Sequence, residues 1–101
     1  ADTCARFVRA SVDGLKLLLN DVPGGMAALK RREPLFDEAL EARRFAMTRD
    51  RSILTPNSRA NGLGHLDMAR ARQLVEVNAE ALGVANPPSA ESMFTDRPLP
   101  R

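Results

Sequence analysis

The stretch that decides the fold is DTCARFVRASVDGLKLLLN, residues 2–20. Its apolar residues recur at steps of three and four, the period of one face of an α-helix. They are Val8, Val12, Leu15 and Leu19, with Phe7, Leu17 and Leu18 beside them. Charged residues occupy the opposite surface, namely Arg6, Arg9, Asp13 and Lys16. Residues 2–20 therefore predict an amphipathic helix that packs one side against other elements.

The next residues predict a break and then a short helix. Pro23 disfavours a helical conformation at Val22, and two glycines follow it, so we expect a turn over residues 20–25. Residues 26–32 are rich in Ala and Leu and favour a helix. This helix should end before Pro34 for the same steric reason.

Charge patterning predicts another helix over residues 34–49, with Pro34 at its first position, where a missing N–H costs no hydrogen bond. Acidic and basic residues separate toward the ends that the helix dipole favours for each. The acidic ones are Asp37, Glu38 and Glu41, and the basic ones are Arg43, Arg44 and Arg49. We expect the acidic group to be a solvated helix start rather than a carboxylate pair for acid–base chemistry.

The C-terminal half predicts a loop, a long helix and an extended tail. Residues 51–64 hold many turn formers and read as a loop. Asp67 then caps an amphipathic helix that Gly83 closes. The tail carries four prolines, with one turn of helix around residues 90–94, and no convincing strand occurs. The predicted fold is mainly α, with three to four helices over residues 1–84 and an extended Pro-rich tail over 85–101.

Composition narrows the functional classes. The chain has 101 residues, of which 44% are hydrophobic and only 4% aromatic, so Leu, Val, Ala and Met should build the core. The formal charge of +2 is too small to indicate a polyanionic partner. A single cysteine excludes an intrachain disulfide and a multi-cysteine metal site. No apolar run approaches the roughly 20 residues that span a bilayer, so we expect no membrane insertion.

Two short motifs resemble the C-terminus of one protein family. The first is Asn61-Gly62-Leu63-Gly64-His65-Leu66-Asp67, which leads into the last long helix, and the second is NPPSAESMFTD, residues 86–96. Both are similar to the solute-binding proteins of ABC importers for nitrate, sulfonates, taurine and thiamine-pyrimidine precursors, the thiamine-pyrimidine-synthase-like family. In that family a glycine loop runs to an aromatic residue or His, then to an apolar residue, and then to an Asp that opens the helix.

The resemblance covers nearly the whole chain. Residues 5–10, ARFVRA, look like the start of a late helix of the family, and Asn20-Asp21-Val22-Pro23 looks like the turn that ends it. Each motif is short, so the resemblance depends on their order and spacing. Two residues depart from the pattern: Met68 stands where the family commonly has Pro, and Ala71 where it often has Trp. These departures leave the subgroup, and hence the solute, open.

The resemblance implies a periplasmic parent with two α/β lobes that close on a small solute and deliver it to a membrane permease. The strands that line such a cleft would lie upstream, so we expect this chain to be a C-terminal helical part of that parent. Its expected role is structural, with no cofactor. By itself it should bind the solute weakly or not at all, and the residues that would contact a ligand are unknown. The residues that would perform synthase chemistry are not among these positions, so we expect no enzyme.

Two single residues are candidates for chemistry. His65 has the side-chain type of a ligand, base or proton carrier, but it is better explained as a turn residue before the Asp67 cap. One His without a nearby Cys, His or carboxylate cluster defines no metal site. Cys4 has the side-chain type of a nucleophile, yet nothing in the sequence fixes a His beside it. We therefore predict no catalytic and no metal site.

Backbone and basic motifs are equally weak signals. Gly24-Gly25 and Gly62-Leu63-Gly64 each precede a predicted helix, where free amides can hold an anion, but neither completes a phosphate loop. Lys30, Arg31 and Arg32 form the only run of three cations. That run leaves one alternative function open, an autonomous helical regulatory or nucleic-acid-binding module.

The apolar helix faces lead to an expectation about assembly. Faces that evolved to meet a missing lobe would be exposed in this chain, and burying apolar surface is favourable by about 25 cal/mol per Å². We therefore expect a homodimer or higher oligomer of the isolated chain, and no nucleic-acid partner for the leading function.

Overall fold

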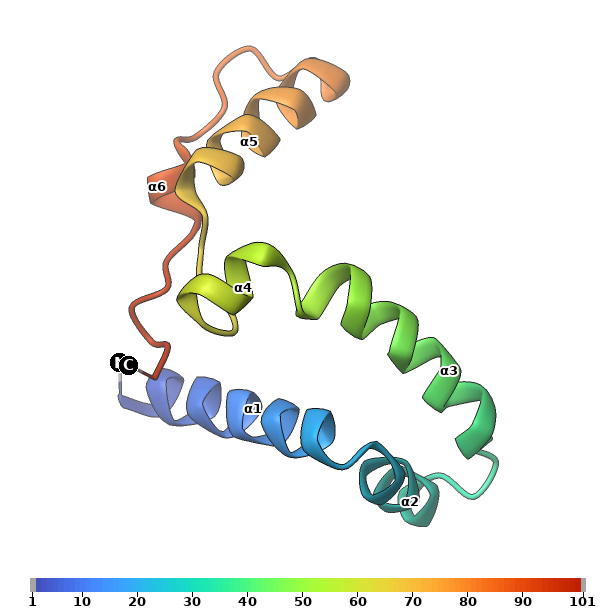
Figure 1. Cartoon of the computed structure of the whole chain (residues 1–101). Coiled ribbons are helices and arrows are strands. Elements are labelled where there is room, and N and C mark those ends of the chain that lie inside the picture. Colours follow the sequence, from blue (N-terminus) through green and yellow to red (C-terminus); the bar gives the residue numbers. More distant parts are fainter. Residues whose placement is uncertain (1, 101) are drawn as a thin grey trace.

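The computed structural model describes residues 2–100. The predicted helical region, 1–84, and the predicted tail, 85–101, each include one residue outside this range. Over these residues the chain is helical and has no strand, which confirms the mainly α fold class. It forms six α-helices and one π-helical turn (Figure 1). Their bounds are α1 Asp2–Asn20, α2 Val22–Arg32, α3 Glu38–Thr48, η1 Arg49–Ile53, α4 Pro56–Asn61, α5 Met68–Leu82 and α6 Ala90–Met93. The prediction of three to four helices was too low.

Helix α1 has the bounds that its apolar period predicts. Its half-buried residues follow that period and form the side that packs; they are Ala5, Val8, Val12, Leu15, Leu18 and Leu19. At its N-terminal end Arg6 forms an exposed ion pair with Asp2 at 3.1 Å. The helix ends where Asp21 N–H donates to Leu17 O, and Asp21 alone separates it from α2.

The predicted turn over residues 20–25 is wrong, because α2 begins at Val22 and includes Pro23 and both glycines. Asp21 caps this helix, and its Oδ1 accepts a hydrogen bond from Gly24 N–H at 3.0 Å. The first turn of a helix needs no intrahelical N–H donors, so Pro23 costs nothing there. Asp21 therefore reduces the break between the two helices to one residue.

The predicted start of the third helix at Pro34 is also wrong. Residues 33–37 form a turn, and α3 begins at Glu38, with Asp37 as its N-cap. Asp37 Oδ1 accepts from Leu40 N–H at 3.0 Å, which satisfies a free amide at the helix start. The predicted end near Arg49 agrees with the last α-helical residue, Thr48.

The predicted loop over residues 51–64 contains two helical segments. The chain continues from α3 through the π-helical turn η1, and α4 then begins at Pro56. Thr55 and Ser58 form a reciprocal capping box: Ser58 N–H donates to Thr55 Oγ1 at 3.2 Å, and Thr55 N–H donates to Ser58 Oγ at 2.9 Å. This box, with Pro56 in the first turn, stabilises a helix that the turn-forming residues obscure.

The predicted bounds of the last long helix are confirmed. Asp67 caps α5 through Arg70 N–H at 3.1 Å, and Gly83 closes it in the left-handed conformation with φ of +67°. The expected helical turn near residue 90 is α6, which is capped by Ser89. The rest of the tail, apart from α6 and a few turns, is irregular.

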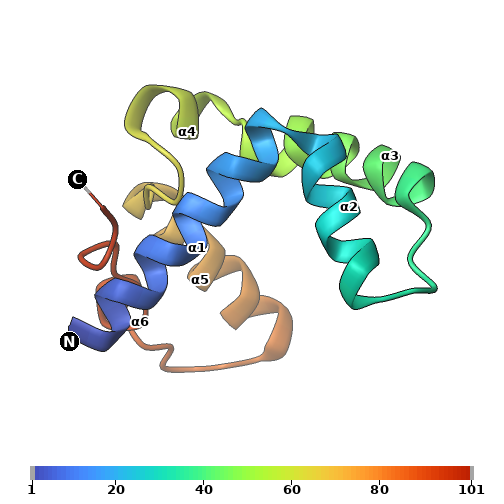
Figure 2. The same cartoon turned by 90° about the horizontal axis from the view of Figure 1, so that it is seen from below.

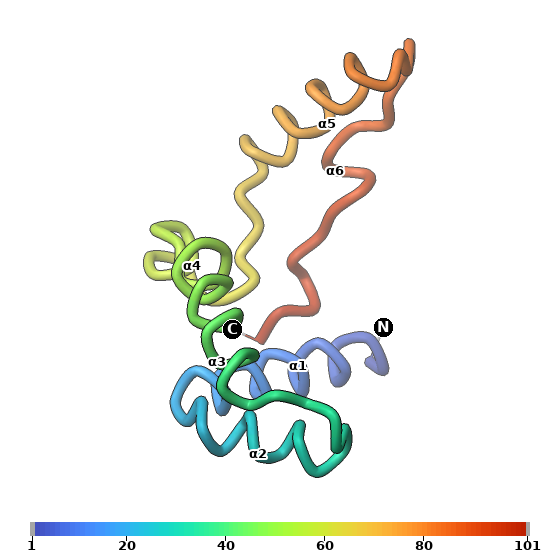
Figure 3. The backbone as a smooth tube through the Cα atoms, turned by 90° about the vertical axis from the view of Figure 1, so that its right-hand side faces the viewer, coloured from blue at the N-terminus to red at the C-terminus, as the bar shows by residue number. Residues whose placement is uncertain are grey.

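The helices form two arms that meet near α4. The N-terminal arm consists of α1, α2 and α3, and the C-terminal arm of α5, α6 and the tail. Figure 1 shows α5 rising away from the N-terminal arm, while the tail runs back down toward α1. Figure 2 looks along this arrangement from below, and Figure 3 shows the C-terminal arm extending as a narrow loop of chain.

Few side chains are buried in this open arrangement. Only Met26, Ala71 and Ala90 are buried among the described residues, with 4%, 5% and 2% exposure. The accessible surface is 7928 Å² and the radius of gyration 16.9 Å. A compact chain of this mass would expose about 5,600 Å², and a compact domain of about 100 residues has a radius near 13 Å. The chain thus leaves much of its apolar surface exposed.

No helix within residues 2–100 combines the length and the apolar character needed to cross a membrane.

Candidate functional site

The cluster of polar residues that most resembles a functional site surrounds His65, in the connection between α4 and α5. Gly62 and Gly64 of this connection have φ values of +98° and +81°, a region that favours glycine. His65 N–H donates to Gly62 O at 3.3 Å, which closes the turn. The His side chain is thereby brought back over α4.

Asn57 of α4 holds His65 at two points. Asn57 Nδ2 donates to His65 O at 3.0 Å, and Asn57 Oδ1 lies 3.1 Å from His65 Nδ1. Asn61 Nδ2 also donates to Asn57 Oδ1, at 2.9 Å. Because an amide oxygen only accepts, His65 Nδ1 carries the proton in this contact, and Nε2 is the ring nitrogen left to accept a hydrogen bond when the ring is neutral.

Two shallow cavities adjoin this cluster. One, of about 450 Å³, lies between α1, the His65 turn and the tail. Its polar lining is Lys16, Asn61, His65 and Asp96. The other, of about 850 Å³, lies where the arms meet, and its apolar lining includes Leu15, Ile53, Leu66, Ala71, Leu74 and Phe94. Gly64 permits the close approach of the tail, because a Cβ there would lie 2.8 Å from Leu99 Cδ2.

The turn cluster lacks the chemistry of a catalytic centre. His65 is exposed, and its side-chain partner is an amide rather than a carboxylate or a nucleophile. Residues 2–100 contain no group of three or more His, Cys, Asp or Glu side chains placed to hold a metal ion. The arrangement suits the structural role of a turn in front of α5, as the sequence interpretation of His65 expects.

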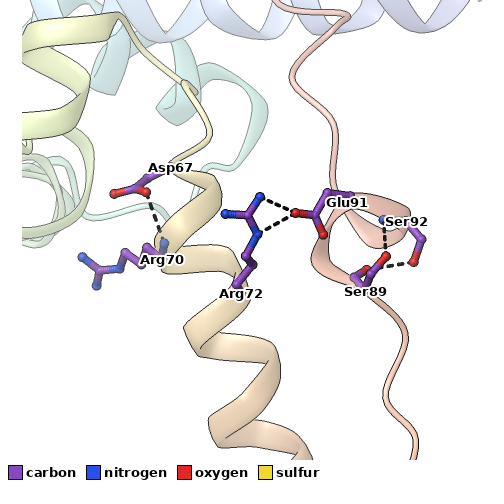
Figure 4. A network of polar contacts seen from close by, with 6 residues as sticks. All are labelled: Asp67, Arg70, Arg72, Ser89, Glu91 and Ser92. Atoms are coloured by element: carbon purple, nitrogen blue, oxygen red, sulfur yellow. Dashed lines mark hydrogen bonds and ion pairs between the residues drawn. The ribbon is translucent and has the colours of Figure 1, made fainter.

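The Asp67 prediction is confirmed, and a second polar contact beside it docks the tail. Arg72 of α5 forms an ion pair with Glu91 of α6, with Nε and Nη2 lying 2.6 and 2.5 Å from Oε1 (Figure 4). The pKa of Glu91 is lowered by its own backbone N–H at the start of α6 and by the Arg72 hydrogen bond. Ser89 caps α6 through Ser92 N–H at 3.3 Å.

An apolar groove runs beside this contact, between α5 and the tail. Its volume is about 340 Å³, and it is lined by Leu74, Val75, Ala79, Leu82, Val84, Pro87, Pro88, Met93 and Phe94, with Asn78 as the polar residue. Several of these side chains are substantially exposed, among them Leu82 at 76% and Met93 at 53%. The groove is therefore an open apolar surface rather than an enclosed ligand site.

The remaining candidates, Cys4 and the two glycine motifs, do not combine into a site. Cys4 lies exposed on α1, and no hydrogen bond within the described residues joins it to His65. Gly24 and Gly25 lie inside α2 instead of before it, and Gly24 N–H is used by the Asp21 cap. Gly62 is the C-cap of α4, and residues 65–67 separate Gly64 from the first residue of α5, Met68. No anion site follows from either glycine motif.

The charged candidates serve local structure. Asp37 is the α3 cap, and Glu41 pairs with Arg44 at 2.6 Å, whereas Glu38 is exposed in the first turn. Lys30 Nζ donates to Phe36 O at 2.7 Å and so holds the turn between α2 and α3. This bond leaves Arg31 and Arg32 as the exposed cations of the run, because Lys30 is half-buried and engaged.

Sequence reasoning missed Asn57, Arg72 and Glu91. The Thr55-Pro56-Asn57-Ser58 sequence holds the signal for α4, since Thr before Pro with Ser three residues later fits a capped helix start. It also missed the Arg49–Asp50 pair of η1, in which the Arg49 hydrogen bond lowers the pKa of Asp50. The Arg72–Glu91 pair spans 19 residues, and no local spacing rule indicates it.

No family model, curated protein or solved structure matches the chain.

Proposed function

We propose that this chain is the C-terminal helical part of a solute-binding protein of an ABC importer, of the sulfonate, nitrate or thiamine-pyrimidine-precursor type. Its role is structural: it packs on one lobe of a two-lobed parent and does not bind the solute by itself. The parent acts in the periplasm and delivers solute to the importer's permease. The chain catalyses no reaction.

One observation carries the proposal, the large excess of exposed surface on well-formed helices. The 7928 Å² of accessible surface exceeds that of a compact chain of the same mass by about 2,300 Å². Side chains cap the N-termini of α2 to α6. Well-formed helices with unpaired apolar faces are typical of a part that is covered by a neighbour. This combination supports a packing role better than an independent domain with its own site.

The groove between α5 and the tail is the surface that the proposal assigns to the parent lobe. It is almost wholly apolar, and the Arg72–Glu91 pair holds one of its walls in place. A lobe surface that covers Leu82 and Met93 would remove two of its most exposed side chains from water. The burial of each is favourable by about 1.5–3 kcal/mol.

Calorimetry tests the division of labour between this chain and its parent. Nitrate, taurine and a thiamine-pyrimidine precursor are each titrated into the purified 101-residue chain. We expect no binding heat, because the cavities beside the His65 turn are shallow and the His65 side chain that lines them is exposed. Tight, saturable binding of any of the three would contradict a purely structural role.

The genomic sequence upstream of the codon for Ala1 tests the family. We expect an open reading frame with a signal peptide followed by alternating strand and helix patterns. A start codon immediately before Ala1 would contradict the proposal and favour an autonomous module.

A further inference from the structure

Within residues 2–100, no helix of the C-terminal arm packs extensively on a helix of the N-terminal arm. The separate helices in extended contact are α1 with α2, α2 with α3, and α5 with α6. The connection from Gly62 to Asp67 joins the arms along the chain, and Gly62 and Gly64 in it have positive φ values. Connections of this kind absorb the backbone rotation when two rigid parts move relative to each other. A fixed angle between the arms therefore requires a second point of attachment.

The last residues of the tail have the burial expected of such an attachment. Asp96, Pro98 and Leu99 are half-buried, whereas residues 84–89 and 91–95 are all exposed. A turn shapes this segment, because Leu99 N–H donates to Asp96 O at 2.9 Å. We call residues 96–100 the strap. Most of the tail thus lies open, and the strap is covered again where it meets the rest of the molecule.

The strap reaches the connection between the arms on one side and α1 on the other. A Cβ at Gly64 would lie 2.8 Å from Leu99 Cδ2, so the Leu99 side chain lies against the backbone of the connection. Leu99 and Pro100 also line the cavity of about 450 Å³ together with Val12 and Lys16 of α1. The end of the tail is seen beside α1 in Figure 1. The C-terminal arm therefore meets α1 through the strap.

The strap contact is small, so it can open without unfolding either arm. Among the described residues, the hydrogen bonds of residues 96–100 stay within the tail. Lys16 and Asp96 line the same cavity with opposite charges, and neither belongs to an ion pair within residues 2–100. Their attraction favours docking without fixing it through a hydrogen bond. Segments with few buried contacts open at a low cost in free energy.

We propose that residues 96–100 form a releasable strap that sets the angle between the two arms. While the strap is docked, the C-terminal arm keeps one orientation, and the cavity of about 850 Å³ between the arms keeps its shape. When the strap is released, the arms turn as rigid bodies about the connection from Gly62 to Asp67. This motion lets a chain with uncovered apolar faces fit them to the surface that covers it. The proposal uses only contacts within the chain and is independent of the proposed function.

Distance measurements by electron paramagnetic resonance test the strap with two matched variants. Nitroxide labels are attached at Ala28→Cys in α2 and Ala81→Cys in α5, both exposed positions, in a Cys4→Ser chain. Leu99→Asp places a charge in the half-buried strap contact, and Leu35→Asp makes the same change at a residue that is 92% exposed. We expect a narrow distance distribution in the labelled parent chain. Leu99→Asp should widen it about twofold, and Leu35→Asp should leave it unchanged.

Hydrogen exchange separates release of the strap from unfolding. Protection within α1 to α3 and within α5 should be the same with and without Leu99→Asp. Lost protection in the helices of either arm would overturn the proposal, because the strap would then be part of a core. Equal distance distributions in the two Asp variants, or a broad distribution before any substitution, would show that the strap does not hold the arms. None of these results alters the expected outcome of the solute titrations.

A pair of glycine variants tests the contact from the side of the connection. Gly62→Ala and Gly64→Ala both place a Cβ on a residue with positive φ, but only the Cβ at position 64 would come within 4 Å of the strap. The backbone strain is shared, so a difference between the variants reports the contact with Leu99. Gly64→Ala should widen the distance distribution more than Gly62→Ala, and Leu99→Ala should abolish that difference. Equal widening by the two glycine variants would overturn the contact between the strap and the connection.

Discussion

The two arms of the molecule are held together by different physical means. In the N-terminal arm, α2 lies between α1 and α3 and buries Met26 to 4% exposure. In the C-terminal arm, the buried residues are the small Ala71 and Ala90, and each precedes a member of the Arg72–Glu91 ion pair. The first arm thus depends on one large apolar side chain, and the second on close approach and charge. The arms should therefore respond differently to mutation, pH and salt.

The largest expected effect is that of Met26→Ala, which removes the only large side chain buried among the described residues. The lost burial and the resulting cavity should lower the free energy of unfolding by about 2–4 kcal/mol. Urea denaturation followed by circular dichroism measures this change. Met47→Ala is the control, because Met47 is 57% exposed, and it should change stability by less than about 0.5 kcal/mol. Equal losses in the two variants would refute a core centred on α2.

Ala90→Leu should have the next largest effect, confined to the C-terminal arm. Ala90 is 2% exposed, so a larger side chain forces α6 away from α5 and costs about 1–3 kcal/mol. Hydrogen exchange should show lost protection in residues 90–94, with α1 to α3 unchanged. Ala81→Leu, at an exposed position of α5, is the matched control. Loss of protection throughout the chain would mean that the arms are not independent.

The sequence predicts well those elements whose signals are local. α5 was predicted from its cap to its closing glycine, because Asp67 and Gly83 act within one turn of the helix. The predicted helix starts were wrong near Pro23 and Pro34, because the proline and a nearby Asp give different local signals. The caps Asp21 and Asp37 decide where each helix starts. The effect of a proline within three residues of a helix cap is therefore ambiguous until the cap is identified.

The candidate site was predictable only in part. The sequence marks His65 as a turn residue and Asp67 as a cap, and both interpretations agree with the structure. The partner of His65 was not predictable, because Asn57 lies in a helix hidden among turn formers. The arrangement of the arms was not predictable either, since Arg72 and Glu91 meet across the α5–tail connection, where no periodicity applies.

Replacing Gly83 and replacing Gly14 by Ala should change the free energy of unfolding in opposite directions. The backbone conformation requires a glycine at position 83 but not at position 14. Gly83→Ala places a Cβ on a residue with φ of +67° and should destabilise the C-terminal arm by about 1–2 kcal/mol. Gly14→Ala, in the open middle of α1, should stabilise the chain by up to about 1 kcal/mol. Thermal denaturation measures both. Destabilisation by Gly14→Ala under these conditions would contradict an uncovered α1 face.

The smallest effect is the pH dependence of the α5–α6 contact. Folding lowers the pKa of Glu91 below its ordinary value of 4.5, mainly through its backbone N–H and then through Arg72. The stabilisation is therefore complete above that value and is lost as pH falls from about 4.5 through the lower folded pKa. Protection of α6 in hydrogen exchange should decrease over this interval.

Glu91→Gln isolates this contribution from all other carboxylates. The stability difference between wild type and Glu91→Gln should be greatest near neutral pH, shrink on acidification and shrink again with added salt, because the Arg72 and Glu91 side chains are 58% and 50% exposed. Urea titrations at several pH values measure the difference, which should be smaller than the losses expected for Met26→Ala, Ala90→Leu and Gly83→Ala. A difference that stays constant across the acid range would mean that burial of Ala71 and Ala90, rather than charge, holds the C-terminal arm together.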